Sequence, residues 1–249
     1  MKSSEVIATR PTKVIYRDGE KAIKVFEPAH KPSDVLRESL NLALVSESGF
    51  CVPGLREIIR LEDKWAIVMD YIEGETMESL MRKNPERIDE YMERFVDIQL
   101  DMHRYSGIGL KNMHEKMHGK IRTSGLDATT RYDLHARLDS IEQHQKLCHG
   151  DFNPSNVIIT PENKACVLDW SHAMCGNASA DAAKTYMMFC LSGDETLAEK
   201  YINLFCKKSD TARQYVEKWL SILAASRLGK NKEEEREFLQ RWANVVDWQ

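Results

Sequence analysis

The sequence predicts an α+β fold in which a small antiparallel sheet with one helix is followed by a mainly helical region. Three observations predict it: a β-hairpin signal at Asp18-Gly19, two further strand-like segments before residue 71, and helical periodicity in much of the chain after residue 76. We therefore expect an N-terminal lobe over residues 1–71 and a C-terminal lobe over residues 72–249.

The composition is that of a globular protein and excludes two classes of partner. The 249 residues are 42% hydrophobic, which is enough for a sizeable core. A formal net charge of -4 gives no basic surface for nucleic acid, and no apolar run approaches the roughly 18 residues of a membrane span. The first residues lack the apolar stretch of a signal peptide, and the six cysteines form no C-x-x-C pair. We expect reduced thiols and a cytoplasmic protein without nucleic-acid or membrane partners.

The first predicted element is a β-hairpin over residues 13–26. Asp18-Gly19 is a strong signal for a two-residue turn between two strand-like runs. Lys24 lies inside the second run, which is otherwise apolar. Because a buried ammonium group is costly unless it meets an anion, Lys24 is a candidate for binding one. The alternative is an edge-strand lysine that points to solvent.

One helix and two more strands complete the predicted sheet region. Ser33 can cap a helix that begins near residue 33, and Gly49 ends it. An apolar stripe at helical spacing is formed by Leu36, Leu40, Ala43 and Leu44. Strands are expected over 55–61 and 65–71, and these segments flank a short polar turn.

The rest of the chain is mostly helical in its periodicity. Helices are expected over 76–81, 87–103, 132–145, 182–191, 196–205, 211–228 and 232–246. Residues 106–130 show only weak periodicity. His114 and His118 have the i,i+4 spacing of a metal site, but without a third ligand a solvated surface is favoured. Three tryptophans could cage a cation, although core packing is favoured for Trp219, Trp242 and Trp248.

Two short strand-like runs carry the polar residues on which the functional prediction depends. The run Val157–Ile159 follows Asp151 and Asn156, and a second run ends in Asp169. A carboxylate can accept a hydroxyl proton, and amide and carboxylate oxygens are hard ligands suited to Mg²⁺. The alternative is a plain polar turn, since Gly, Asp, Asn and Pro all favour turns.

The motif His149-Gly150-Asp151 followed by Asn156, and then Val167-Leu168-Asp169-Trp170, resembles the aminoglycoside phosphotransferase/choline kinase family of small-molecule kinases. The resemblance covers residues 14–181 approximately and is weak in the last third of the chain. It implies a bilobal, protein-kinase-like fold. It also implies transfer of the γ-phosphoryl group of ATP, with Mg²⁺, to a hydroxyl group of a small molecule such as an aminoglycoside, choline or a sugar.

The resemblance implies roles for the residues of the C-terminal motif. Asp151 would accept the hydroxyl proton, and Asn156 and Asp169 would bind Mg²⁺. Asp181, near the next helix start, would hold the amides of the motif as a structural acceptor, and it could equally serve as a helix N-terminal Asp.

The resemblance also implies roles in the N-terminal region. Lys24 would hold the α- and β-phosphates of ATP and would be oriented by Glu38, with Glu47 as a weaker competitor for that role. The backbone around Asp70 and Ile72 would bind the adenine edge.

Two departures define the alternatives. Residues 7–13, where a glycine-rich loop over the phosphates is expected, contain no glycine. This favours a second class, a catalytically weak or silent nucleotide-binding protein of the same fold. Eukaryotic-type protein kinases carry Arg at the position of Gly150 and usually Phe-Gly at Trp170-Ser171, so a protein kinase is the less favoured third class.

Overall fold

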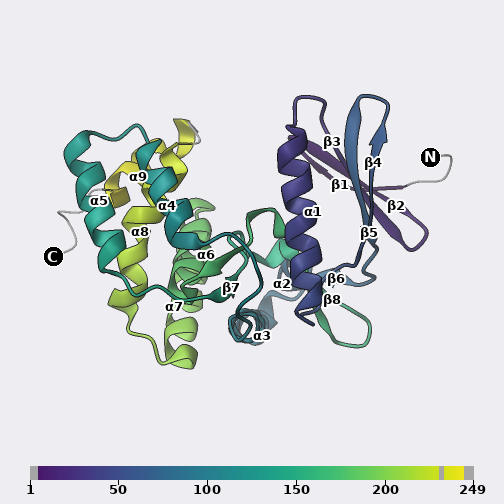
Figure 1. Ribbon diagram of the computed structural model, residues 1–249. Helices are drawn as coiled ribbons and strands as arrows, with labels where there is room; N and C mark the ends of the chain where they lie inside the picture. The colour runs from purple at the N-terminus through teal and green to yellow at the C-terminus, as the bar shows by residue number, and fades with distance from the viewer. Residues whose placement is uncertain (1–4, 230–232, 244–249) are drawn as a thin grey trace. The chain divides into compact units, whose positions relative to one another are not determined.

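The computed structural model describes residues 5–229 and 233–243, which belong to two compact units (Figure 1). The first unit comprises residues up to 88 together with 154–172, and the second comprises 89–153 together with the chain from 173 onward. An antiparallel sheet dominates the first unit and helices dominate the second. This confirms the predicted α+β class, while the lobe limits drawn at residue 71 remain a prediction.

The main sheet of the first unit has the strand order β1-β2-β3-β5-β4, with antiparallel pairing throughout. Its strands are β1 (Glu5–Arg10), β2 (Lys13–Asp18), β3 (Lys21–Phe26), β4 (Leu55–Leu61) and β5 (Lys64–Asp70). The predicted hairpin is confirmed as β2–β3, with Gly19 at a φ of +60° in its turn. Strand β1 was not predicted. The glycine-free segment 7–13 is mostly strand, and a two-residue turn at positions 11 and 12 joins β1 to β2.

Helix α1 (Pro32–Glu47) packs beside β4 and β5 (Figure 1). The stripe predicted for this helix is wrong, because Leu36 and Leu40 are exposed. Its buried face instead combines apolar and polar side chains: Val35, Glu38, Ser39, Asn41, Leu42 and Val45. The helix also begins after Lys31, so Ser33 does not cap it.

Two apolar clusters lie on opposite faces of the main sheet, as the alternation of side chains along β5 requires. One cluster contains Ile23, Ala66 and Val68, and the other contains Phe26, Val35 and Ile67. The second cluster joins α1 to the sheet, which fixes the helix over one face.

The remaining elements of the first unit are short. They are β6 (Glu75–Thr76), α2 (Met77–Lys83), η1 (Pro85–Arg87), η2 (Pro154–Asn156), β8 (Val157–Ile159), β9 (Ala165–Val167) and η3 (Trp170–His172). Strands β6, β8 and β9 form a small antiparallel sheet in that order. The two apolar runs around the polar motif are therefore the paired strands β8 and β9.

The second unit combines helices with a two-stranded ribbon. Its elements are α3 (Ile88–Met102), α4 (Met113–Arg122), α5 (Ala128–Ser140), α6 (Ala178–Leu191), α7 (Glu195–Ser209), α8 (Arg213–Leu228), α9 (Glu233–Ala243), β7 (Lys146–Cys148) and β10 (Met174–Gly176). In the part of the chain that the structure covers, no helix is long and apolar enough to cross a membrane.

Two helix predictions in this unit are wrong. Helix α4 lies within the segment given only weak periodicity, and α5 begins and ends four to five residues before the predicted 132–145. Asn112 and Asp127 cap these helices through side-chain oxygens, which explains their starts. Trp219 is buried and Trp242 stacks on Tyr186, while Trp248 and both ends of the helix predicted over 232–246 lie outside the described residues.

Candidate active site

Lys24 lies at the centre of a buried ionic cluster in the first unit. Strand β3 has neighbours on both sides, and Lys24 is only 2% exposed. Its ammonium group donates to the Glu38 carboxylate and, at 3.0 Å, to Oδ1 of Asp169. The solvent-facing alternative is thereby excluded. Glu47 is exposed at the end of α1, so the partner of Lys24 is Glu38.

The pKa values of this cluster follow from burial and ion pairing. Burial alone lowers the pKa of Lys24, but the nearby Asp169 and Glu38 carboxylates outweigh it and raise that pKa above its ordinary value. Burial alone raises the pKa of Asp169, but Lys24 and Lys13 hold it well below its ordinary value. Both residues are therefore charged at neutral pH.

Lys13 also belongs to the cluster; the sequence indicated it, with Arg10, as a charge that could assist phosphate binding, but it did not indicate the pairing of Lys13 with Asp169. It begins β2, directly after the β1–β2 turn, and its Nζ lies 2.8 Å from Oδ2 of Asp169. Burial and the neighbouring Lys24 lower the pKa of Lys13, against the opposing effect of Asp169. Each oxygen of Asp169 thus accepts a hydrogen bond from a different lysine.

Backbone contacts bring the two predicted magnesium ligands into neighbouring segments. The amide of Leu168, the residue before Asp169, donates to the carbonyl of Asn156 at 2.8 Å. Asp169 has a φ of +62°, a left-handed conformation that is uncommon for residues other than glycine. Two flanking bonds hold this turn: the Trp170 indole donates to Val167 O, and Asn41 donates to Trp170 O. An amide and a carboxylate oxygen form a donor set that matches Mg²⁺.

The predicted adenine-binding segment follows β5. The amide of Asp70 donates to the carbonyl of Gly54 at 2.9 Å, and its carboxylate accepts from Gly54 N and Arg56. The amide of Asp70 is therefore not available to a ligand edge. For Ile72, the structure records no backbone hydrogen bond to another described residue.

In the second unit, Asp151 follows a tightly held loop. Gly150 has a φ of +74°, a conformation that favours glycine. The amide of Asp151 donates to Nδ1 of the fully buried His149 at 3.2 Å. The side chain of Asn153 donates to Asp151 O at 2.9 Å. These bonds fix the backbone from which the Asp151 carboxylate projects.

Asp181 holds the same loop from the first turn of α6, as predicted. Its Oδ1 accepts from Gly150 N at 2.7 Å and its Oδ2 accepts from His149 N at 3.3 Å. Oδ2 also lies 3.1 Å from Nε2 of His103 and accepts from Gln99. Both interpretations of Asp181 are confirmed, since it is a loop acceptor and a helix N-terminal Asp. The part of His103 was missed, because a histidine at a helix end carries no sequence signal for a partner 78 residues away.

This arrangement makes the loop sensitive to acid. Burial alone raises the pKa of Asp181, but hydrogen bonds from His103 and Gly150 and the charges of His103 and His149 lower it to about 2, from an ordinary value of 3.8. A carboxylate with a depressed folded-state pKa contributes stability that is present above its unfolded-state pKa and is lost as the pH falls through its folded-state pKa. The relevant window is therefore about pH 4 to about pH 2.

We expect Asp181→Asn to remove this pH dependence. The free energy of unfolding should fall by on the order of 2 kcal/mol at pH 7, and the difference from the unmodified protein should shrink between about pH 4 and pH 2. Urea unfolding at a series of pH values measures this difference in the free energy of unfolding. A difference that stays constant down to about pH 2 would contradict this account of Asp181.

The fold and the ionic cluster define the class of the protein. A lysine on a central strand of an antiparallel sheet pairs with a glutamate on the adjoining helix and with an aspartate after a later strand pair, which is the arrangement of the protein-kinase-like fold. The chain matches the family model of the phosphotransferase enzyme family over residues 11–219 and belongs to that family. The predicted family and the predicted enzyme class, a phosphotransferase, are confirmed.

Solved structures with the same fold are distant in sequence. An aminoglycoside-3'-phosphotransferase of type VIII is 15% identical, with a TM-score of 0.64 and coverage of 92% of each chain. A thermostable mutant of aminoglycoside phosphotransferase APH(4)-Ia, in a ternary complex with ADP and hygromycin B, is 11% identical, with a TM-score of 0.73 and coverage of 99% of this chain and 94% of the other.

Choline kinase LicA from Streptococcus pneumoniae is 15% identical, with a TM-score of 0.64 and coverage of 97% of this chain and 92% of the other. No curated protein matches the sequence. These likenesses confirm the predicted kinase-like fold.

Proposed function

We propose that this protein is an ATP- and Mg²⁺-dependent kinase that transfers the γ-phosphoryl group to a hydroxyl group of a small molecule. The observation that carries the proposal is the buried Lys24 held between Glu38 and Asp169. Burying an ammonium group and two carboxylates is costly for stability alone, so the cluster is best explained by function.

In the first unit, each residue of the cluster has a part in holding ATP. Lys24 would bind the α- and β-phosphates, and Glu38 would orient it from α1. The Asp70 carbonyl and the Ile72 amide would bind the adenine edge. Asn156 and Asp169 would hold Mg²⁺, which when bound neutralises the charge that develops on the phosphates.

In the second unit, Asp151 would orient the acceptor hydroxyl and take its proton. The hydroxyl oxygen bonds to the γ-phosphorus, the bond from that phosphorus to the β–γ bridging oxygen breaks, and ADP leaves. In a loose transition state the proton moves late, so the group that accepts it need not be a strong base. His149 and Asp181 hold the loop and do not react.

The acceptor is a small hydroxylated molecule. Support comes from the family and from similar structures, one of which is a complex with ADP and hygromycin B and another a choline kinase. Amines, amino alcohols and sugars are the classes to test first. The measurement is ADP release with ATP and Mg²⁺ across a panel of aminoglycosides, choline, amino alcohols and sugars.

A second candidate function is a protein that binds nucleotide without turning it over. Two observations favour it: the β1–β2 turn contains no glycine, and both oxygens of Asp169 accept from lysines. Nucleotide binding by calorimetry, without ADP release for any acceptor and without ATP hydrolysis, would favour this candidate over the kinase.

Lys13 offers a prediction about the missing glycine loop. We expect Lys13→Met to raise KM for ATP about tenfold and to change kcat less, because Lys13 would replace backbone amides as a partner of the phosphates. The matched control is Lys21→Met, which removes a half-exposed lysine from the same sheet. Steady-state kinetics measure both constants, and an unchanged KM would remove Lys13 from phosphate binding.

A further inference from the structure

A second group of ligand atoms lies outside the residues assigned to phosphoryl transfer. His114 and His118 stand one turn apart on α4, and Asp139 lies on α5. Nε2 of His114 lies 3.1 Å from Oδ1 of Asp139, and Nε2 of His118 lies 2.9 Å from the same oxygen. One ligand atom from each residue lies within 4.8 Å of the other two. The third ligand that the i,i+4 pair lacked in the sequence is therefore supplied by the packing of α4 on α5.

The His114 nitrogen has no satisfactory partner within this group. Its Nε2 is buried and makes no hydrogen bond to any described residue, although Asp139 Oδ1 is close. A buried polar atom without a hydrogen bond is costly and requires an explanation. Two imidazole nitrogens and one carboxylate oxygen that converge in this way would all be satisfied by a cation among them.

His135 gives the group the outer support that metal-binding histidines usually have. Its Nδ1 lies 2.6 Å from Nδ1 of His118, and the two rings are stacked with centroids 4.8 Å apart. When Nε2 of a histidine binds a metal, Nδ1 carries the proton and donates it to a second residue. His135 can accept that proton, which would fix the tautomer and the ring orientation of His118.

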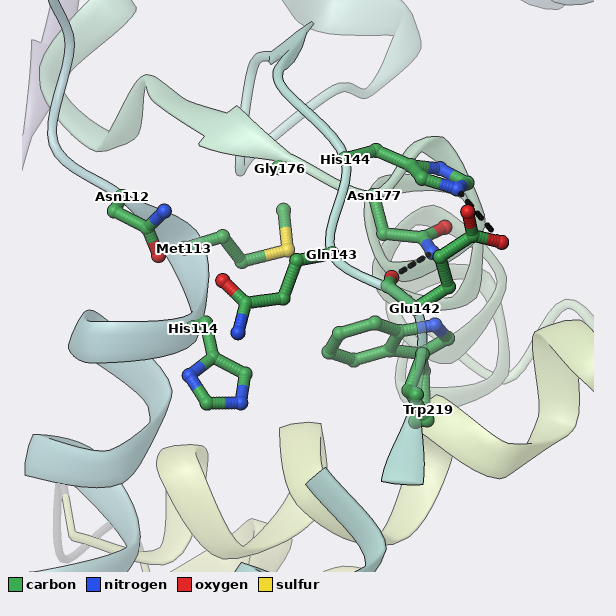
Figure 2. Close-up of a pocket in the computed structure, with 10 residues that line it drawn as sticks. Asn112, Met113, His114, Glu142, Gln143, His144, Gly176, Asn177 and Trp219 are labelled. Atoms are coloured by element: carbon green, nitrogen blue, oxygen red, sulfur yellow. Dashed lines mark hydrogen bonds and ion pairs between the residues drawn. The ribbon is translucent and has the colours of Figure 1, made fainter. Parts of the chain in front are cut away.

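A pocket in the same unit borders the group. His114 lines it together with Gln143 and Trp219 (Figure 2). The group itself is only partly buried, since Asp139 is exposed and both histidines are intermediate. Because Asp139 is exposed, its carboxylate is open to an ion from solvent.

We propose that His114, His118 and Asp139 bind one Zn²⁺ ion, with His135 as the positioning residue of His118 and a water molecule as the fourth ligand. Two histidines and one carboxylate with an open fourth position form a known zinc ligand set, and imidazole also suits Ni²⁺ and Cu²⁺. The ion joins α4 to α5 and stabilises their packing, because it binds the folded protein and not the unfolded chain.

The test is metal binding by the untagged full chain, measured by calorimetry with Zn²⁺ and by visible absorption with Co²⁺. We expect one ion per chain, a tetrahedral Co²⁺ spectrum and a rise in the thermal midpoint with Zn²⁺. His114→Ala, His118→Ala and Asp139→Asn should each lose binding and the midpoint shift. His135→Ala should weaken Zn²⁺ binding about 10- to 100-fold.

Two controls keep the test decisive. His30→Ala removes an imidazole from the first unit and should bind Zn²⁺ like the unmodified protein. Circular dichroism without metal establishes that each variant is folded, and His118→Gln serves if the alanine variant is not. Absence of Zn²⁺ binding by the unmodified chain, or equal binding by a folded His118 variant, would overturn the proposal. Neither result bears on phosphoryl transfer, since the kinase residues are untouched.

Discussion

Asp151→Asn should lower kcat about 10²- to 10⁴-fold while leaving nucleotide binding nearly intact. The amide cannot accept the hydroxyl proton, but it has almost the same size as the carboxylate. The loop should keep its shape, because Asp181 accepts hydrogen bonds from the amides of His149 and Gly150. The Thr185 hydroxyl also donates to the carbonyl of Phe152, and none of these bonds uses the Asp151 carboxylate. ADP release measures turnover, and calorimetry with a non-hydrolysable ATP analogue measures binding.

The control for this prediction is Asp101→Asn, which changes an exposed aspartate of the same unit. It should match the unmodified protein in both measurements. Unchanged turnover by Asp151→Asn would exclude Asp151 from the mechanism. Lost nucleotide binding would instead indicate that the variant disturbs the loop.

Lys24→Met should abolish turnover and also destabilise the fold. It leaves Glu38 buried without its cation and removes one of the two lysines that Asp169 contacts. Breaking a buried ion pair from one side costs about 3–5 kcal/mol, a large fraction of the stability of an ordinary domain. Urea unfolding measures the loss of stability, and calorimetry measures the loss of nucleotide affinity.

Two further variants separate the structural part of Lys24 from its part in binding. Lys21→Met on the same strand removes a half-exposed lysine and should change neither the free energy of unfolding nor the nucleotide affinity by much. Lys24→Met/Glu38→Leu removes both charges and should recover part of the stability without recovering activity. Recovery of activity in the double variant would show that phosphate binding does not depend on Lys24.

The local pattern of the sequence indicated only one member of the central pair of the first unit. Lys24 lies in an otherwise apolar strand, which made it a candidate for binding an anion, whereas Glu38 as its partner followed from the family resemblance. The predicted limits of β4 and β5 lie close to the observed ones, as do those of the helices after residue 176. Periodicity is a local property, so it can be recognised in the sequence.

The errors arise where tertiary contacts override local patterns. Helix α1 buries Glu38, Ser39 and Asn41 and exposes Leu36 and Leu40, because its buried face meets polar partners in the ionic cluster and at Trp170 O. Strand β1 was missed because it is mostly exposed and lacks a buried face. Helix α4 did carry a usable signal, the four-residue spacing of its buried apolar side chains, which are Met113, Met117 and Ile121.

The partners in the candidate sites could not be predicted for a related reason. Lys13 and Asp169 are 156 residues apart, and Asp139 reaches His118 across 21 residues. No local pattern specifies such pairs, and only the packed chain brings them together. The motif around Asp151 indicated the chemistry of the site, while the composition of its ionic cluster required the structure.

The pairing of two lysines with two carboxylates around Asp169 has a kinetic consequence. Two cations and two anions cancel, so this region exerts little long-range pull on an approaching polyanion, and the whole chain, at a formal charge of -4, exerts none. ATP should therefore associate without attractive electrostatic steering. Its association rate constant should not fall as the ionic strength rises, and its arrival exchanges existing ion pairs for new ones.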